Sequence, residues 1–369
     1  PARLVLEPHG KLMDLGDHRG DPFHPRNPLV IVPGFFTGTT IPGGTRTSFV
    51  SRSPLTGIWG EATVGGTWGA EFRCTGYDGL VILGAASSPV YLWINDDHVE
   101  IRPAERLWGK DTYEACDLLL EETDPKAKVA AIGQAGENLV RIAAVMVEGR
   151  HARAAGRTGM GAVMGAKKLK AIVVRGTRGV PVYNPAGLMG WALRKTNEVP
   201  AMFGMFTVYG TSGSIETHEE RGGLPIKNFQ EGHWREGAAR ISGKTIHERY
   251  AVKSSSCSGC PIHCWQHVTI EDGNGVRENV GHNPEYETLG SFGAMLLNDD
   301  LPSVIRANEL CNRYGLDTIS AGNSIAFAIE AFERGLISER DTGGVKLAWG
   351  DGEAILAMVE QVAFRKHLG

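Results

Sequence analysis

The sequence has 369 residues, a length that favours two domains with room for a third. A hydrophobic content of 42% and a charged content of 22% are ordinary for a globular protein, and a net charge of −4 argues against a nucleic-acid-binding surface or a polybasic membrane surface. No apolar run is long enough to span a bilayer and no signal peptide is recognisable, so a cytoplasmic location is predicted.

Strand-like patterns dominate the first half of the chain. Residues 1–28 are polar and predict irregular structure, residues 65–69 predict a glycine-rich loop, and residues 109–123 have helical periodicity. Strands are predicted at residues 29–32, 45–53, 80–83, 90–94, 98–101, 129–132, 141–147 and 171–176.

After Pro185 apolar residues recur at helical spacing, notably in residues 301–314, 320–334 and 351–366. The sequence therefore predicts an α+β protein, with a β-rich domain over residues 1–182 and a mostly helical domain over residues 183–369. The chain begins without Met, and its last helix is expected to end at a glycine cap, Gly369. We expect the sequence to be a fragment of a longer protein.

Cys257, Cys260 and Cys264 form a C-x2-C-x3-C pattern. Three thiols this close favour a metal centre, and an iron–sulfur cluster with a fourth ligand elsewhere is the main interpretation. A Cys3His zinc site using His263 or His267, and a reactive or structural group of thiols, remain alternatives. The remaining cysteines are scattered and are predicted to be small buried hydrophobic residues: Cys74, Cys116 and Cys311.

Two basic, glycine-rich stretches suggest phosphate binding. In residues 153–168, backbone N–H groups can approach an anion without obstruction by Cβ atoms, and Arg153 carries a compensating charge. A tightly packed helix–sheet junction is the alternative for this stretch. Arg46, which follows Gly43 and Gly44, is a second candidate for clamping a phosphate.

Two later stretches carry carboxylates. Glu285 and Glu287 could serve acid–base chemistry near a metal, or could simply lie at a helix N-terminus. Gly315 is predicted to stop a helix, and Asp317 is placed to cap the next helix or to accept hydrogen bonds from an amino-substituted heterocycle.

Taken together and in this order, these stretches resemble the aldehyde ferredoxin oxidoreductase family of tungsten enzymes, over nearly the whole chain. The resemblance implies tungsten or molybdenum held by two pterins, a [4Fe–4S] cluster, and Mg²⁺ bridging the pterin phosphates. It also implies a β-rich base under the pterins, followed by helical domains.

The resemblance assigns roles to particular residues. Cys257, Cys260 and Cys264 would bind the cluster, and Glu287 would face the metal as the catalytic base. The implied cofactor-binding residues are Arg46, Arg153, Ala154, Asn312, Gly315, Leu316 and Asp317.

The sequence also departs from the family. Asn312 replaces the first Asp of the pterin loop, and Thr63 and Val64 stand where the family often has Asn. A second pterin loop, a fourth cluster cysteine and a histidine near the metal belong to a third domain that this sequence does not include.

The implied activity is oxidation of a small aldehyde to a carboxylic acid, with electrons passing through the cluster to ferredoxin or another electron-transfer protein. A benzoyl-coenzyme A reductase-type tungsten subunit is one alternative, and a non-catalytic fragment of such an enzyme is another. A homo- or hetero-oligomer is compatible with the sequence, and neither nucleic acid nor membrane insertion is expected.

Overall fold

The computed structural model describes residues 20–271 and 277–369, so the predicted irregular structure of residues 1–19 lies outside the described part. The chain divides into two compact units. The first contains the chain up to Val199 together with Cys257–Pro261 and Asn312–Asp317; the second contains Pro200–Ser256, Ile262–Cys311 and Thr318–Gly369. Two short segments from the second half of the sequence therefore fold with the first unit.

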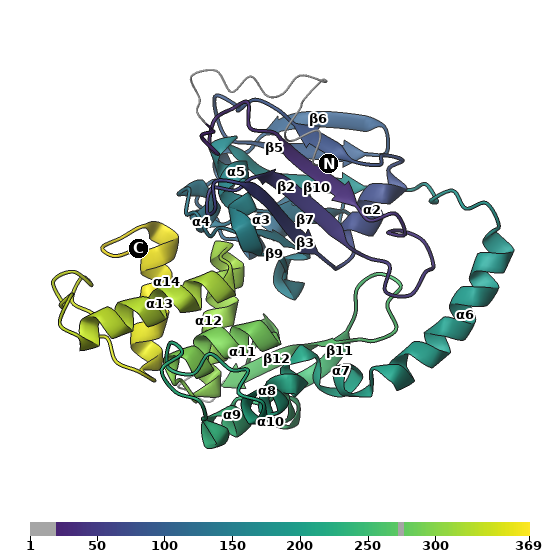
Figure 1. Cartoon of the computed structure of the whole chain (residues 1–369). Helices are drawn as coiled ribbons and strands as arrows, with labels where there is room; N and C mark the ends of the chain where they lie inside the picture. The colour runs from purple at the N-terminus through teal and green to yellow at the C-terminus, as the bar shows by residue number, and fades with distance from the viewer. Residues whose placement is uncertain (1–19, 272–276) are drawn as a thin grey trace. The chain divides into compact units, whose positions relative to one another are not determined.

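The first unit contains two sheets (Figure 1). One has the antiparallel order β3-β2-β1-β4 and consists of β1 (Leu29–Pro33), β2 (Thr47–Arg52), β3 (Trp59–Val64) and β4 (Leu80–Ile82). The other has the order β6-β5-β10-β7-β8-β9 and consists of β5 (Val90–Asn95), β6 (His98–Pro103), β7 (Lys128–Ala131), β8 (Val145–Val147), β9 (Arg153–Ala155) and β10 (Leu169–Arg175). In the six-stranded sheet β5 and β10 run parallel, whereas the other neighbours are antiparallel.

Strand β10 separates two hydrophobic cores. Ile172 and Val174 belong to the core shared with the four-stranded sheet, and Ala171 and Val173 belong to the core on the opposite face, as the two-residue period of a strand requires. Helices α2 (Trp68–Cys74) and α5 (Met160–Ala166) contribute to the first core, and α3 (Thr112–Glu122) contributes to the second. Together these layers form the framework that carries the candidate site.

The glycines of α5 allow close backbone packing. A Cβ on Gly165 would lie 1.9 Å from the Gly136 carbonyl oxygen in α4 (Gln134–Glu137), and a Cβ on Gly161 would lie 2.3 Å from the Ala144 carbonyl oxygen. Both distances are far below a normal contact, so only glycine fits. Dense packing, the alternative interpretation of residues 153–168, is confirmed for these two glycines, and phosphate binding by the stretch stays a prediction.

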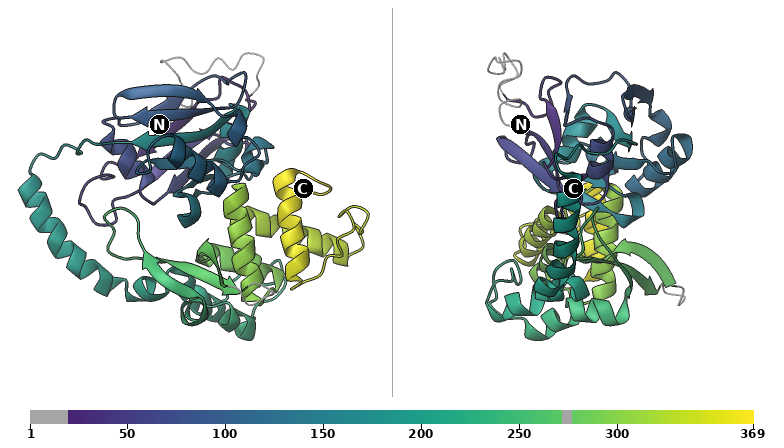
Figure 2. Two further views of the ribbon diagram at one scale, coloured as in Figure 1. Left: turned by 180° about the vertical axis from the view of Figure 1, so that it is seen from behind. Right: turned by 90° about the vertical axis from the view of Figure 1, so that its right-hand side faces the viewer.

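The second unit is mostly helical. Its helices are α7 (Gly204–Tyr209), α8 (Ile215–Glu220), α9 (Arg235–Arg240), α10 (Gly243–Arg249), α11 (Tyr286–Phe292), α12 (Leu301–Tyr314), α13 (Thr318–Glu333) and α14 (Gly352–Phe364). The last residues of α12 belong to the first unit, and α6 (Pro185–Met202) ends at the start of the second. Within the second unit α13 packs against α14, in the green-to-yellow part of Figures 1 and 2.

A three-stranded antiparallel sheet in the second unit was not predicted. It has the order β11-β12-β13 and consists of β11 (Ala251–Ser255), β12 (Trp265–Glu271) and β13 (Arg277–His282). In β12 the apolar residues Val268 and Ile270 alternate with polar neighbours, which is a strand signal.

Most predicted elements are confirmed, and three boundaries are corrected. The strand predicted at residues 141–147 is restricted to Val145–Val147, since the Ala144 N–H donates to Gly315 instead of to a neighbouring strand. Trp68 and Gly69, predicted in the glycine loop, begin helix α2. Helix α14 ends at Phe364 with Arg365 in the left-handed conformation, so Gly369 is not its cap. In the described residues, no helix combines the length and apolarity needed to cross a membrane.

Candidate active site

The first part of the cysteine segment, residues 257–264, is held by loops of the first unit. Cys257 Sγ accepts a hydrogen bond from the Gly66 N–H at 3.1 Å, and the Ser258 N–H donates to the Gly66 carbonyl at 3.1 Å. On the other side, Thr45 Oγ1 donates to the Ser258 carbonyl at 2.6 Å. A Cβ on Gly65 would lie only 2.7 Å from Cys257 Sγ, so the glycine is needed for this approach.

The three cysteines form no disulfide and are half-buried. The Cys260 N–H donates to the Cys257 carbonyl at 3.1 Å, which closes a tight turn, whereas Cys264 belongs to the second unit. Among the described residues no three Cys, His, Asp or Glu side chains are gathered around one metal position. Within the first unit, Cys257 and Cys260 supply two thiols, and the Gly66 N–H is directed at one of the sulfurs, which suits ligands of an iron–sulfur cluster.

The loop Asn312–Asp317 is bound to the first unit through its backbone. The Ala144 N–H donates to the Gly315 carbonyl at 2.7 Å, and the Asp317 N–H donates to the Ile142 carbonyl at 3.0 Å. Gly315 has φ of +70°, a left-handed conformation that favours glycine and confirms the predicted helix stop. These bonds fix the path of the loop independently of its side chains.

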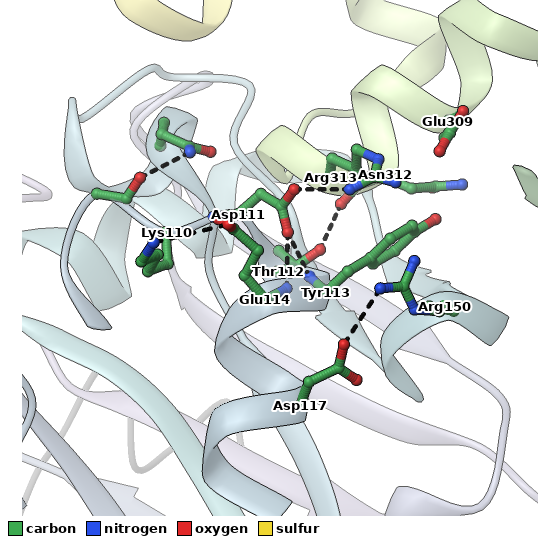
Figure 3. Close-up of polar contacts among 12 residues, drawn as sticks. Lys110, Asp111, Thr112, Tyr113, Glu114, Asp117, Arg150, Glu309, Asn312 and Arg313 are labelled. Carbon is green, nitrogen blue, oxygen red and sulfur yellow. Dashed lines mark hydrogen bonds and ion pairs between the residues drawn. The ribbon is translucent and has the colours of Figure 1, made fainter. Parts of the chain in front are cut away.

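Helix α3 supplies a second anchor for this loop (Figure 3). Thr112 Oγ1 donates to the Asn312 carbonyl at 2.8 Å, and the Arg313 guanidinium pairs with Asp111 at 2.9 Å while lying 4.7 Å from the centre of the Tyr113 ring. Asp111 also forms a capping box with Glu114 at the start of α3. Sequence reasoning missed this anchor, although the Asp-x-x-Glu pattern of the cap was readable.

Two side chains of the loop are relevant to cofactor binding. Asn312 is buried, and its Nδ2 has no hydrogen-bond acceptor among the described residues. Such an orphaned donor suits a cofactor that offers an acceptor. Asp317 is also buried and pairs with Arg157, with 3.1 Å between Nε and Oδ2. Leu316 is buried and bridges to Ala143.

The predicted phosphate-binding residues lie in the first unit, and their exposure differs. The side chain of Arg46 is exposed, and its backbone carbonyl accepts hydrogen bonds from the Gly34 N–H at 2.7 Å and from Thr37 Oγ1 at 2.9 Å. Arg153 is half-buried and Ala154 is exposed, both in β9. These exposed or half-buried positions are accessible to an anion.

Glu287 lies in the second unit, in the first turn of α11, and is exposed. Its neighbour Glu285 is the N-cap residue and accepts a hydrogen bond from Thr211 Oγ1. The helix N-terminus, the alternative interpretation of residues 283–288, is therefore confirmed as their location. Burial, together with the nearby Glu287 carboxylate, raises the pKa of the Tyr286 phenol. A catalytic role for Glu287 stays a prediction.

The other cysteines fit their predicted role in part. Cys116 and Cys311 are buried, whereas Cys74 is half-buried and therefore corrects the prediction. Burial raises the pKa of Cys116 to about 12 and also raises the pKa of Cys74. Both thiols therefore stay protonated near neutral pH, which makes them poor metal ligands.

Comparison with known proteins identifies relatives of the whole chain. The family model for the N-terminal domain of aldehyde ferredoxin oxidoreductase matches residues 10–176, and the model for its domains 2 and 3 matches residues 187–369. A tungsten-containing aldehyde ferredoxin oxidoreductase from Thermococcus kodakarensis is 41% identical over 96% of this chain and 58% of its own length. An enzyme of the same description from Pyrococcus furiosus is 41% identical over 95% of this chain and 57% of its own length.

Two further relatives have different activities. The WOR-like subunit of an aliphatic sulfonate oxidoreductase from Pyrococcus furiosus is 33% identical over 95% of this chain and 57% of its own length. The solved active-site complex BamBC of benzoyl coenzyme A reductase, bound to 1,5-dienoyl-CoA, superimposes with a TM-score of 0.79 at 29% identity, covering 94% of this chain and 53% of that chain. The chain thus spans somewhat more than half the length of these relatives. Because the two family models together match nearly all of it, the chain belongs to the aldehyde ferredoxin oxidoreductase family.

Proposed function

We propose that this chain is part of an enzyme that oxidises an aldehyde to a carboxylic acid at a tungsten or molybdenum bis-pterin centre. The reaction consumes one aldehyde and one water, and it releases one carboxylic acid, two protons and two electrons. The electrons leave singly through a [4Fe–4S] cluster to ferredoxin or another electron-transfer protein. Two relatives that are 41% identical are tungsten-containing aldehyde ferredoxin oxidoreductases, which supports this substrate class.

The observation that carries the proposal is that the first unit contains both Cys257–Pro261 and Asn312–Asp317, although both segments are distant from it in sequence. The first segment would supply cluster ligands, with Cys264 as the third thiol. The loop would bind a pterin through the orphaned amide of Asn312, with Gly315 and Leu316 fixing the backbone.

The remaining assignments follow the family pattern. Arg46 would bind a pterin phosphate, and Arg153 and Ala154 would lie at the phosphates and their Mg²⁺. Asp317, which pairs with Arg157, would accept hydrogen bonds from the pterin. The bound metal would supply two-electron oxidation of the substrate. Glu287 is the proposed base that activates water or takes up the proton of the aldehyde.

The first experiment is metal and sulfide analysis of the chain, produced anaerobically in a host supplied with tungstate and molybdate. About four irons per chain together with one tungsten or molybdenum would support the proposal. Zinc in place of both would contradict it. In an enzyme that turns over aldehydes, Glu287→Gln should abolish turnover while metal content stays unchanged; full activity of this variant would remove Glu287 from the mechanism.

A benzoyl-coenzyme A reductase-type activity is the second candidate, because the BamBC complex superimposes on nearly the whole chain. The two candidates differ in the direction of electron flow. Aldehyde-dependent reduction of a dye acceptor would favour the first, whereas consumption of an aromatic coenzyme A thioester in the presence of a low-potential donor would favour the second.

A further inference from the structure

Glu148 makes an unusual set of contacts with the glycine loop of the first unit. One carboxylate oxygen, Oε1, accepts the Thr67 N–H at 2.6 Å and the Trp68 N–H at 2.8 Å. The other, Oε2, accepts Thr67 Oγ1 at 2.7 Å. A single side chain thus satisfies three donors at the loop. It reaches them from the left-handed conformation, with φ of +73°, which is costly for a residue with a Cβ.

The loop that Glu148 holds is the loop that contacts Cys257. Gly66 directly precedes Thr67, has φ of +87°, and uses its N–H to donate to Cys257 Sγ. A Cβ on Gly66 would lie 2.8 Å from the Glu148 carboxylate, so the carboxylate and the glycine backbone are in close contact. The orientation of the Gly66 N–H therefore depends on where Glu148 fixes the next two residues.

We propose that Glu148 is a positioning residue for the cysteine segment: it fixes the Gly65–Gly66 turn so that the Gly66 N–H points at Cys257 Sγ. Hydrogen bonds to cysteine sulfur stabilise the more negative, reduced form of an iron–sulfur cluster and raise its reduction potential. Through this bond Glu148 contributes to the potential of the cluster, and this second part rests on the proposed function. Glu148 itself touches neither the sulfur nor, in the proposal, the reacting atoms.

Two substitutions separate positioning from charge. Glu148→Gln keeps an oxygen that can accept both backbone N–H groups and places an amide next to Thr67 Oγ1, so it removes the charge and preserves the contacts. Glu148→Ala removes the charge and the contacts together. Because both variants lack the carboxylate charge, a difference between them reports the loss of positioning alone.

Asp96 offers a matched control in the same unit. It is also a non-glycine residue with positive φ, at 51°, and its carboxylate accepts both the Thr177 N–H at 2.8 Å and Thr177 Oγ1 at 2.7 Å. Asp96→Ala therefore removes the same type of carboxylate–threonine contact at a turn that does not carry the cysteine segment.

The first readout is amide hydrogen exchange in the full chain without added metal. Glu148→Ala should accelerate exchange at Gly66, Thr67 and Trp68 by about tenfold or more, whereas Glu148→Gln and Asp96→Ala should leave these amides close to wild type. Unchanged exchange in Glu148→Ala would overturn the positioning role. This measurement does not need a cluster, so it stands even if the proposed function fails.

The second readout is the midpoint potential of the anaerobically assembled cluster, followed by electron paramagnetic resonance during a redox titration. The potential of Glu148→Ala should lie below that of Glu148→Gln, and Asp96→Ala should match wild type. Equal potentials in the two Glu148 variants would overturn the link to the cluster. Failure of the wild-type chain to assemble any cluster would instead count against the proposed function.

Discussion

Gly65 lies where the glycine loop meets Cys257. We expect Gly65→Ala to displace the thiol, because the new Cβ would lie 2.7 Å from Sγ. The iron and sulfide content of the assembled chain should fall, and the free energy of unfolding should drop by about 1–3 kcal/mol, as in other overpacked sites. Chemical iron and sulfide assays and denaturant unfolding measure the two effects.

Gly179→Ala is the matched control for this substitution, since no atom lies within 4 Å of the Cβ it would add. Its stability should change by no more than about 0.5 kcal/mol, with normal iron content. If Gly65→Ala bound as much iron as Gly179→Ala, the close approach of the glycine loop to Cys257 would have no bearing on metal binding.

Lys167 is a buried cation whose effect on the free energy of unfolding depends on pH. Its Nζ donates to the carbonyls of Pro25 at 3.1 Å and Gly84 at 3.0 Å, and burial lowers its pKa to about 8. Between this value and the unfolded value the unfolded chain holds more protons, so the free energy of unfolding should rise with pH. From pH 7 to pH 10 the rise attributable to Lys167 is about 2 kcal/mol.

Denaturant unfolding of wild type and Lys167→Met at both pH values measures this difference. The stability of wild type relative to the variant should increase from pH 7 to pH 10. Lys168→Met is the control, because the neighbouring Lys168 is exposed. If the difference in free energy of unfolding between wild type and Lys167→Met stayed constant over this range, burial would not lower the pKa of Lys167.

At the scale of elements, the Arg313 cation is one of the contacts that join α3 to the loop Asn312–Asp317. Arg313, which is 24% exposed, pairs with Asp111 and covers the Tyr113 ring. Removing it leaves the Asp111 carboxylate, which is 12% exposed, without this partner. We expect Arg313→Ala to lower the free energy of unfolding by about 1.5–3 kcal/mol and to accelerate amide exchange in residues 312–317.

Arg150→Ala tests the same helix at its exposed side. Arg150 pairs with Asp117 at 3.2 Å, both side chains are at least half exposed, and its guanidinium also lies over Tyr113, at 5.8 Å (Figure 3). Exposed ion pairs contribute little to stability, so the free energy of unfolding should fall by less than about 1 kcal/mol. Amide exchange in residues 312–317 should not change. Equal effects of the two substitutions would show that burial does not set the strength of the anchor.

At the scale of the whole molecule, the first unit is completed by segments far along the chain. A chain that ends at Val199 lacks Cys257–Pro261 and Asn312–Asp317, and with them the partners of the Gly66 N–H, the Ala144 N–H and Thr112 Oγ1. We expect this shorter chain to fold its sheets but to be less stable than the same unit in the intact chain.

Amide exchange in β10 measures this effect, because β10 lies at the centre of the first unit and reports on that unit alone. Exchange there should be at least about tenfold faster in the shorter chain, equivalent to about 1.4 kcal/mol. Equal protection in the two chains would mean that the added segments contribute nothing to the stability of the unit.

The sequence by itself determined the elements whose signals are local. The apolar spacing of residues 301–314 predicted α12 with the observed bounds, and residues 171–176 predicted nearly the whole of β10. Gly315 was recognisable as a helix stop, and the C-x2-C-x3-C spacing singled out the cysteine segment. Each of these signals depends on residues a few positions apart, where periodicity, capping and turn preference act directly.

Only the tertiary structure decided which elements meet. The strand order of the mixed sheet, the attachment of Asn312–Asp317 to the first unit, and the contact between Glu148 and the loop of Gly66 all join residues that are distant in sequence. Such contacts follow from packing and from the pairing of buried polar groups, and these leave no periodic pattern along the chain. The sequence therefore indicated candidate residues for the chemistry, and the fold decided which residues hold these candidates in place.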